Sequence, residues 1–167
     1  MGLTNETIKA RLTEKFGDQL GSFEEPYGML TFEAPKELNL KVLNFLYDEE
    51  DLRFRFLTDL TGVHYPTQTG RELAVVYHLH NMTDNIRIRF KVFTSISQPD
   101  VYTVTGLFSA ANWMERETYD FLGLNFVGHP NLKRILNVDE MDYFPLRKEF
   151  PLEDQTRIDK DDEMFGR

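Results

Sequence analysis

The sequence predicts an α+β fold, with a mixed, largely antiparallel sheet covered by helices and followed by an extended C-terminal arm. Three patterns predict it. Apolar residues recur at helical spacing up to about residue 50, they alternate with polar residues from Leu52 to Val92, and periodicity fades beyond Pro130. A sheet with one apolar face needs a second layer over that face, and the helices can supply it.

A first short amphipathic helix is predicted near the N-terminus. Asn5 is of a residue type that caps helix N-termini, and Ile8, Leu12 and Phe16 follow at a spacing of four. Gly17 then offers a helix stop, because glycine readily adopts the backbone conformation that ends helices.

Two further helices are predicted. Pro35 stands where a first helical residue is expected, and an apolar stripe from Leu38 to Leu46 precedes an acidic run. Ser109 is expected to cap the third helix, which reaches Gly123.

Strands are predicted between the second and third helices. Side chains alternate in the runs 53–56, 73–79 and 86–92. The polar spacer 81–85 suits an antiparallel hairpin between the last two runs. A further short apolar run covers 101–104.

The domain organisation follows from where the periodicity ends. Residues 1–142 are predicted to form a single α+β domain, and residues 143–167 an extended acidic arm that wraps partner subunits. From Asp139 to Arg167 the chain holds ten acids against five bases, with prolines and aromatic residues among them. An extended segment of this kind buries area against a partner and is ordered on assembly.

Composition excludes several function classes. The chain has no cysteine, so it offers no thiolate ligands for zinc or for an iron–sulfur cluster. A net charge of -9 argues against nucleic acid or anionic lipid as the main partner. No stretch approaches the roughly 18 apolar residues of a transmembrane helix, so no direct membrane span is expected.

Glu117 departs from ordinary packing in the predicted third helix. At about 100° per residue it falls in the middle of an apolar stripe. The stripe consists of Ala110, Trp113, Met114 and Phe121. An ionised carboxylate in an apolar stripe needs a partner, and Arg134 is the candidate within the chain because a guanidinium binds a carboxylate with two bonds. Solvent exposure at the helix edge and a salt bridge to another subunit are the alternatives.

Other candidate sites are weaker. His78 and His80 share one strand face, but two imidazoles without a third ligand are more simply explained as part of a polar surface. His129 is a candidate acid–base partner for Glu117, although a histidine in a turn is more often structural. The basic strand face at 87–91 is either solvated or docks an acidic neighbour. No glycine-rich nucleotide loop or nucleophile elbow is present.

Several segments together resemble a known family, the 30-kDa subunit of respiratory complex I, which in bacteria is the C subunit of NADH:quinone oxidoreductase. The resemblance spans Thr105 to Pro151. Its residues are Thr105–Phe108, Ala111–Trp113, Glu115–Glu117, Tyr119–Gly123, His129–Pro130, Lys133–Leu136 and Phe144–Pro151.

The resemblance implies a cofactor-free structural subunit in the quinone module of the peripheral arm. The complex passes electrons from NADH through iron–sulfur clusters to quinone and couples this to ion translocation. FMN, the clusters and quinone would lie in other subunits. The implied partners are the large quinone-site subunit and the iron–sulfur subunits, and the implied location is the cytoplasmic side of the bacterial inner membrane, peripherally bound.

On this reading the chain holds no catalytic, cofactor-binding or metal-binding residue, and a set of charged residues instead fixes its shape and contacts partners. The set comprises Glu115, Arg116, Glu117, Asp120, His129, Arg134, Arg147 and Lys148. Two alternatives stay open at this point. One is the equivalent subunit of a related hydrogenase, deazaflavin or ferredoxin dehydrogenase complex, and the other is a free-standing acid–base enzyme that uses Glu117 and His129.

Overall fold

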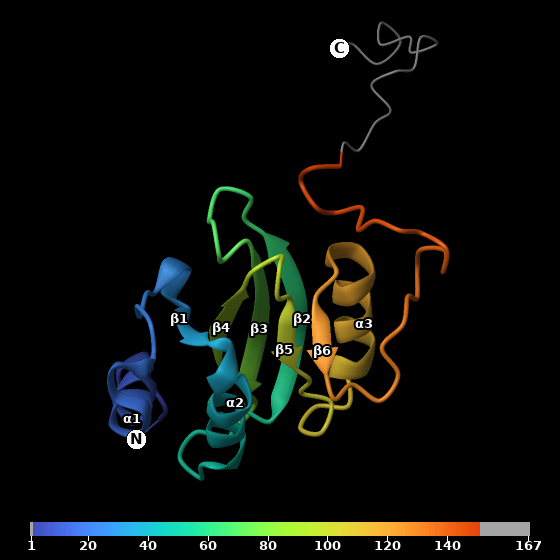
Figure 1. Cartoon of the computed structure of the whole chain (residues 1–167). Coiled ribbons are helices and arrows are strands. Elements are labelled where there is room, and N and C mark those ends of the chain that lie inside the picture. Colours follow the sequence, from blue (N-terminus) through green and yellow to red (C-terminus); the bar gives the residue numbers. More distant parts are fainter. Residues whose placement is uncertain (1, 151–167) are drawn as a thin grey trace, which may run out of the picture.

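The computed structural model describes residues 2–150 of the chain (Figure 1). A four-stranded sheet has the order β1–β4–β3–β2, in which β1 runs parallel to β4 and the other pairs are antiparallel. The predicted α+β class with a mixed, largely antiparallel sheet is therefore confirmed. The elements are α1 (Asn5–Phe16), β1 (Leu30–Pro35), α2 (Asn39–Asp48), β2 (Phe56–His64), β3 (Leu73–Asn81), β4 (Ile86–Thr94), β5 (Asp100–Tyr102), α3 (Ala111–Leu122) and β6 (Asn125–Val127).

The hydrophobic core lies between one face of this sheet and the helices. Alternate residues of β3 and β4 point into it, and Phe90 stacks between Phe32 of β1 and Tyr77 of β3 at ring-centroid distances of 5.1 and 5.5 Å. The apolar side chains of α1 and α2 join the same cluster. Figure 1 shows α2 in front of the sheet and α3 beside β2.

α1 ends at the predicted glycine, but the residue that caps its N-terminus differs from the predicted one. Thr4, not Asn5, caps the helix, because its hydroxyl accepts from Thr7 N while the Thr7 hydroxyl accepts from Thr4 N. Asn5 is already helical, and its amide instead donates to Glu25 and to the Gly28 carbonyl. Gly17 ends the helix as predicted, with a φ of 55°.

Two boundary predictions around the second helix are wrong. Leu30–Pro35 is the parallel strand β1, so Pro35 ends a strand, and a 3₁₀ turn at Lys36–Leu38 leads into α2. Of the predicted strand 53–56, residues 53–55 are irregular and follow a turn at 50–52. Arg53 has a φ of 45° and Phe54 is fully buried, so β2 starts only at Phe56.

α3 packs across β2 on the core side of the sheet. Gly62 of β2 lies opposite Val75, a core residue, and a Cβ at Gly62 would come within 2.5 Å of Leu122 and 2.8 Å of Thr118. The missing side chain therefore permits the close approach. The helix starts at Ala111 without a side-chain cap, so Ser109 is not its cap, and Gly123 ends it in the left-handed conformation.

The chain then returns over α3. Leu146 N donates to the Phe121 carbonyl, and Phe144 lies against Gly123. Residues 143–150 thus contact the domain body, whereas 151–167, where the rest of the predicted arm falls, lie outside the described residues. The boundary at 142 stays a prediction. Within the described part of the chain, no helix has the length and apolar character needed to cross a membrane.

Candidate functional site

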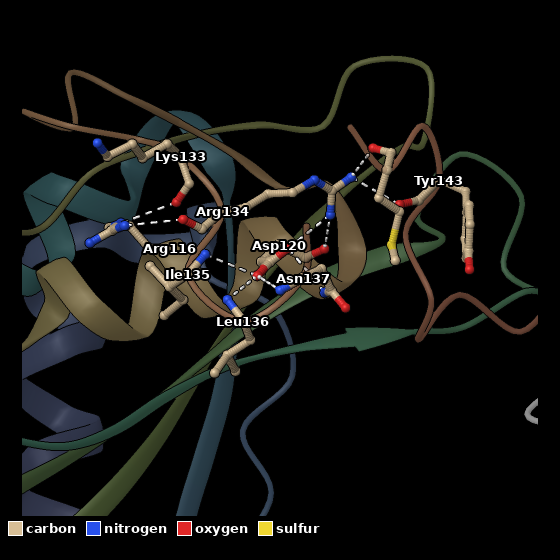
Figure 2. A network of polar contacts seen from close by, with 9 residues as sticks. Arg116, Asp120, Lys133, Arg134, Ile135, Leu136, Asn137 and Tyr143 are labelled. Carbon is tan, nitrogen blue, oxygen red and sulfur yellow. Dashed lines mark hydrogen bonds and ion pairs between the residues drawn. The ribbon is translucent and has the colours of Figure 1, made fainter. Parts of the chain in front are cut away.

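Asp120 organises the segment that follows β6. Its carboxylate is fully buried near the end of α3 and accepts five hydrogen bonds (Figure 2). Oδ2 accepts from the backbone N–H groups of Ile135, Leu136 and Asn137 at 2.8 to 3.0 Å. Oδ1 accepts from Arg134 and from the Asn137 amide. The segment bends around one carboxylate, which satisfies three successive backbone donors.

Arg134 completes this arrangement from the other side. Its Nη1 donates to Oδ1 and to the backbone oxygen of Asp120, both at 2.8 Å. Its Nη2 donates to the carbonyls of Met141 and Tyr143, and the guanidinium lies 5.2 Å from the Phe144 ring centre. The Arg134 side chain therefore links α3 to Met141, Tyr143 and Phe144 in the segment that returns over the helix.

The pKa of Asp120 reflects these contacts. Burial alone would raise it, but donation from Asn137 and Leu136 N–H groups, from Arg134 and from the Asn137 amide outweighs burial. The pKa of this carboxyl is therefore held well below its usual range, and Asp120 is ionised in the folded protein.

Arg116 makes a second link between α3 and the same segment. Its Nε and Nη2 donate to the carbonyls of Lys133 and Arg134, both at 3.1 Å (Figure 2). The guanidinium also lies 5.0 Å from the ring centre of Trp113, which is 63% exposed. Among residues 2–150 Arg116 has no carboxylate within ion-pair distance.

Asp120, Arg134 and residues 135–137 form what we call the Asp120 cluster. Glu115 lies on the buried side of α3, separate from this cluster. Its Oε1 accepts from Val104 N at 2.7 Å and its Oε2 from the Thr103 hydroxyl at 2.5 Å. Burial raises the pKa of Glu115 to about 7, although these two hydrogen bonds oppose the rise. Glu115 therefore joins the start of α3 to the segment that directly follows β5.

His129 stands 4.0 Å from Glu115, with both ring nitrogens already engaged. Nδ1 accepts from Asn131 N at 3.0 Å, which assigns the proton to Nε2, and Nε2 donates to the Asn112 carbonyl at 3.1 Å. Both contacts are to backbone, so the ring closes a turn against α3.

Glu117 is exposed, so the expectation of a buried carboxylate paired with Arg134 is wrong, and the alternative of a solvent-exposed side chain is the one that the structure has. Within the described residues the side chain has no basic partner in ion-pair range. Arg134, its predicted partner, binds Asp120 instead. Two residues correspond to about 200° around a helix, so Glu117 faces away from Glu115 and the neighbouring His129.

Arg147 and Lys148 anchor the end of the described chain. Arg147 Nε donates to the Leu122 carbonyl at 2.8 Å and its guanidinium lies 4.7 Å from the Phe144 ring centre. Lys148 contributes its backbone N–H, which donates to Nδ1 of His64 at the end of β2. Both residues hold the segment against the domain.

The two strand histidines each have a nearby partner. Nε2 of His78 accepts from Arg89 at 2.9 Å, and Nε2 of His80 lies 3.0 Å from the Asn85 side-chain oxygen. Within the described part of the chain, no group of three or more histidine, aspartate or glutamate side chains is arranged to hold a metal ion.

The sequence matches the family model described as respiratory-chain NADH dehydrogenase, 30 Kd subunit, over residues 32–156. The chain belongs to this 30-kDa subunit family. The match includes α3, the Asp120 cluster and the segment that Arg134 and Arg147 hold. The buried charges are thus part of the matched region.

Curated relatives agree with this membership. The chain is 40% identical over 153 residues to the C subunit of NADH-quinone oxidoreductase from Citrifermentans bemidjiense, covering 92% of this chain and 93% of that protein. It is 46% identical over 125 residues to the protein of the same name from Nocardioides sp. (strain ATCC BAA-499 / JS614), covering 75% of this chain and 50% of that protein. The chain thus spans about half the length of several curated relatives.

Solved structures share the fold of this 30-kDa subunit family member. A trypsin-resistant fragment (1–134) of Nqo5 has a TM-score of 0.65 and 30% identity, covering 75% of this chain and 98% of that one. A chain from a membrane-bound sulfane sulfur reductase, an archaeal respiratory membrane complex, has a TM-score of 0.73 and 23% identity, covering 88% of this chain and 85% of that one. The second likeness is one of fold alone.

Sequence reasoning missed several residues that bind the two buried acids of α3. Asn137 binds Asp120 through both its backbone and its side chain, and Thr103 with Val104 binds Glu115. A signal for Asn137 is its place directly after the Lys133–Leu136 segment of the family resemblance. Nothing in the local pattern identified the contacts of Thr103 and Val104.

Proposed function

We propose that the chain is a cofactor-free structural subunit in the quinone module of an NADH:quinone oxidoreductase. In this role it supports electron transfer from NADH through iron–sulfur clusters to quinone, coupled to ion translocation, without a catalytic residue of its own. FMN, the clusters and quinone would be bound by other subunits. Membership in the 30-kDa subunit family carries the proposal.

The geometry of α3 supports a structural role. Most hydrogen bonds of three buried charged residues are to backbone atoms, chiefly of residues 133–141, and none of these bonds points into an open cavity. The three residues are Asp120, Arg134 and Arg116. Buried charges with this pattern of partners specify a conformation, which is what an assembly subunit requires.

The same region exposes apolar side chains that a lone soluble domain does not need. Of eleven exposed large hydrophobic residues among those described, five come from α3 and residues 134–150. These are Trp113, Leu136, Val138, Tyr143 and Leu146, with exposures between 41% and 65%. Exposed aromatic and aliphatic side chains gathered in one part of a chain are typical of protein contacts. We place the contact with the large quinone-site subunit here, and that with the iron–sulfur subunits nearby.

The location follows from the same proposal. The chain would sit on the cytoplasmic side of the bacterial inner membrane, peripherally, through its partners. The acidic arm predicted over residues 143–167 would wrap neighbouring subunits.

The test compares two acids on the same helix. The full chain is tagged and purified from solubilised membranes as wild type, Asp120→Asn and Glu117→Gln. We expect the wild type and Glu117→Gln to retain flavin- and iron-bearing partners and NADH:quinone activity, and Asp120→Asn to lose both. The same outcome also opposes an acid–base enzyme that depends on Glu117.

Two results would overturn the proposal. One is a stoichiometric flavin, iron or zinc bound to the isolated chain. The other is a purified assembly that oxidises hydrogen, reduced deazaflavin or ferredoxin but not NADH, which would assign the chain to a related complex instead.

A further inference from the structure

The sheet face opposite the helices carries a row of basic side chains. Along β4, Arg87, Arg89 and Lys91 alternate with the core residues Ile88 and Phe90 and so point to the other side. In the register of the sheet they stand beside His80, His78 and Val76 of β3. α1, α2 and α3 all pack on the core side, so no helix among residues 2–150 covers this row.

These cations lack carboxylate partners in the described part of the chain. Neither the row nor Arg53 at its end forms an ion pair there. Arg55 is not part of this set, because its Nε donates to the Tyr47 carbonyl of α2 on the helical side. Two acids on this face, Glu33 and Asp59, have other partners nearby. Glu33 binds Arg71 at 2.6 Å, and Asp59 lies 3.6 Å from His78. The face is therefore positive within a chain of net charge -9.

Arg89 is held in place across β3. Its Nε donates to Nε2 of His78 at 2.9 Å, and burial, followed by the charge of Arg89, lowers the pKa of that histidine, so the ring stays neutral and accepts the bond. The two terminal nitrogens of the guanidinium are not used by this contact. A fixed guanidinium fork is suited to bind a carboxylate with two bonds.

A hollow continues the basic row at its Arg87 end. It has a volume of about 350 Å³ and adjoins the row through His80, which stands opposite Arg87. Its lining consists of Arg53, Arg55, Phe56, His80, Met82 and Thr83. Phe56 is 49% exposed and Met82 is 65% exposed, so the hollow offers apolar walls with Arg53 beside them.

We propose that this basic sheet face binds an acidic segment of another protein chain, with carboxylates on Arg87, Arg89 and Lys91 and an apolar side chain in the hollow. Charge complementarity selects such a segment. The apolar walls favour a peptide over a phosphate polymer, and the net charge of -9 repels long polyanions and anionic bilayers at a distance. The surface is separate from the α3 region to which the quinone-site contact is assigned.

Photo-crosslinking in cells tests the proposal with the full chain. A benzophenone amino acid is placed at Thr61, an exposed residue of β2 on this face, because Thr61 stands opposite Val76 and leaves the basic row intact. Adducts are mapped by mass spectrometry. We expect them on a protein segment rich in Asp and Glu. Adducts on lipid, on nucleic acid or on segments without excess acid, or the absence of any adduct, would overturn the proposal.

A charge-reversal pair provides the matched control. Arg87→Glu with Lys91→Glu is expected to reduce the Thr61 adduct by at least about tenfold. Lys15→Glu with Lys41→Glu, two exposed cations on the helical side, should leave the adduct unchanged. Equal yields from both pairs would refute the proposal.

Two further measurements separate binding from misfolding and from loss of the whole assembly. Arg87→Gln with Lys91→Gln adds no negative charge, so a reduced adduct with an unchanged melting temperature is a loss of binding in a folded chain. Co-purifying subunits report on the proposed function, whereas the adduct reports only on this face, so failure of either is recognised independently.

Discussion

Replacing Asp120 with Asn should release the segment 134–150 from α3 while leaving the sheet intact. The carboxylate accepts five hydrogen bonds, and an Asn side chain has a single acceptor oxygen. If that oxygen keeps the three backbone donors, the new NH₂ group faces Arg134 and the Asn137 amide, which are donors themselves. Two donors lose their acceptor, and the Arg134 guanidinium, which is 8% exposed, loses its counter-charge.

The size of the effect follows from these losses. Each buried polar group left without a partner costs about 1–3 kcal/mol. Breaking a buried ion pair by removing one charge costs about 3–5 kcal/mol in total. The local free energy that closes the segment over α3 should therefore fall by about 3–5 kcal/mol, which corresponds to a factor of about 100 or more in the opening equilibrium.

Native-state hydrogen exchange measures this directly. The amides of Ile135, Leu136 and Asn137 each donate to Oδ2 of Asp120, so their exchange reports the opening. We expect these amides to exchange about 100-fold faster or more in Asp120→Asn. Amides at the centre of β3 should change far less, because that strand is bonded on both sides within the sheet.

Glu117→Gln is the control, since it makes the same chemical change on the exposed side of the same helix. It should leave exchange at all three amides unchanged. If Asp120→Asn altered exchange by less than about threefold, or if both variants altered it equally, the reasoning that Asp120 fastens the segment would be refuted.

Three further predictions concern the packing of α3, a buried acid and the end of the described chain. Gly62→Val should push α3 away from β2 and lower stability by about 1–3 kcal/mol, measured by urea unfolding. Glu115→Gln should remove a pH dependence of the free energy of unfolding. A carboxyl whose folded pKa is raised to about 7 contributes stability that is present below pH 4.5 and is lost as the pH rises through about 7. The wild type should therefore be more stable at pH 5 than at pH 8, and the variant should not. Ending the chain after Asp142 should lower the melting temperature by a few degrees and abolish incorporation into the complex, because the contacts of Phe144 and Arg147 are lost.

Each of these has a matched comparison. Gly106→Ala, where an added Cβ has nothing within 4 Å, should be near neutral, and equal losses at both glycines would oppose the packing argument. Asp120 keeps its charge from pH 5 to 8 because its pKa is lowered, so any pH dependence that survives Glu115→Gln must have another source. Ending the chain after Phe150 keeps every described contact, and a large fall in melting temperature for that chain would contradict the third prediction.

Much of the fold could be predicted because local patterns agree with tertiary packing. The period-two runs of β3 and β4 follow from the alternation of side chains along a strand. The end of α1 follows from the backbone conformation that Gly17 adopts. β1 was missed because Pro35 is equally compatible with a strand end and a helix start, and only pairing with β4 decides between them. The start of β2 is misplaced in the prediction because Phe54 is buried in an irregular stretch after a turn, which produces alternation without a strand.

The error at Glu117 has a similar physical origin. Trp113 suggested a buried face, yet it lies on the surface beside Arg116. The buried face of α3 includes Thr118 and a fully buried Glu115, so apolar periodicity cannot locate it. The Asp120 cluster depends on a chain reversal more than ten residues later, and a helix pattern contains no information about where that reversal occurs.

The hydrogen bonds that hold residues 134–150 against α3 affect how strongly a partner can bind. A loop that must be ordered on binding loses about 1–2 kcal/mol of backbone entropy for each residue fixed. Here Asp120 and Arg134 hold that loop in shape within the free chain, so most of this loss is met during folding. A partner then encounters a preorganised surface, and a modest contact area can give a long-lived complex.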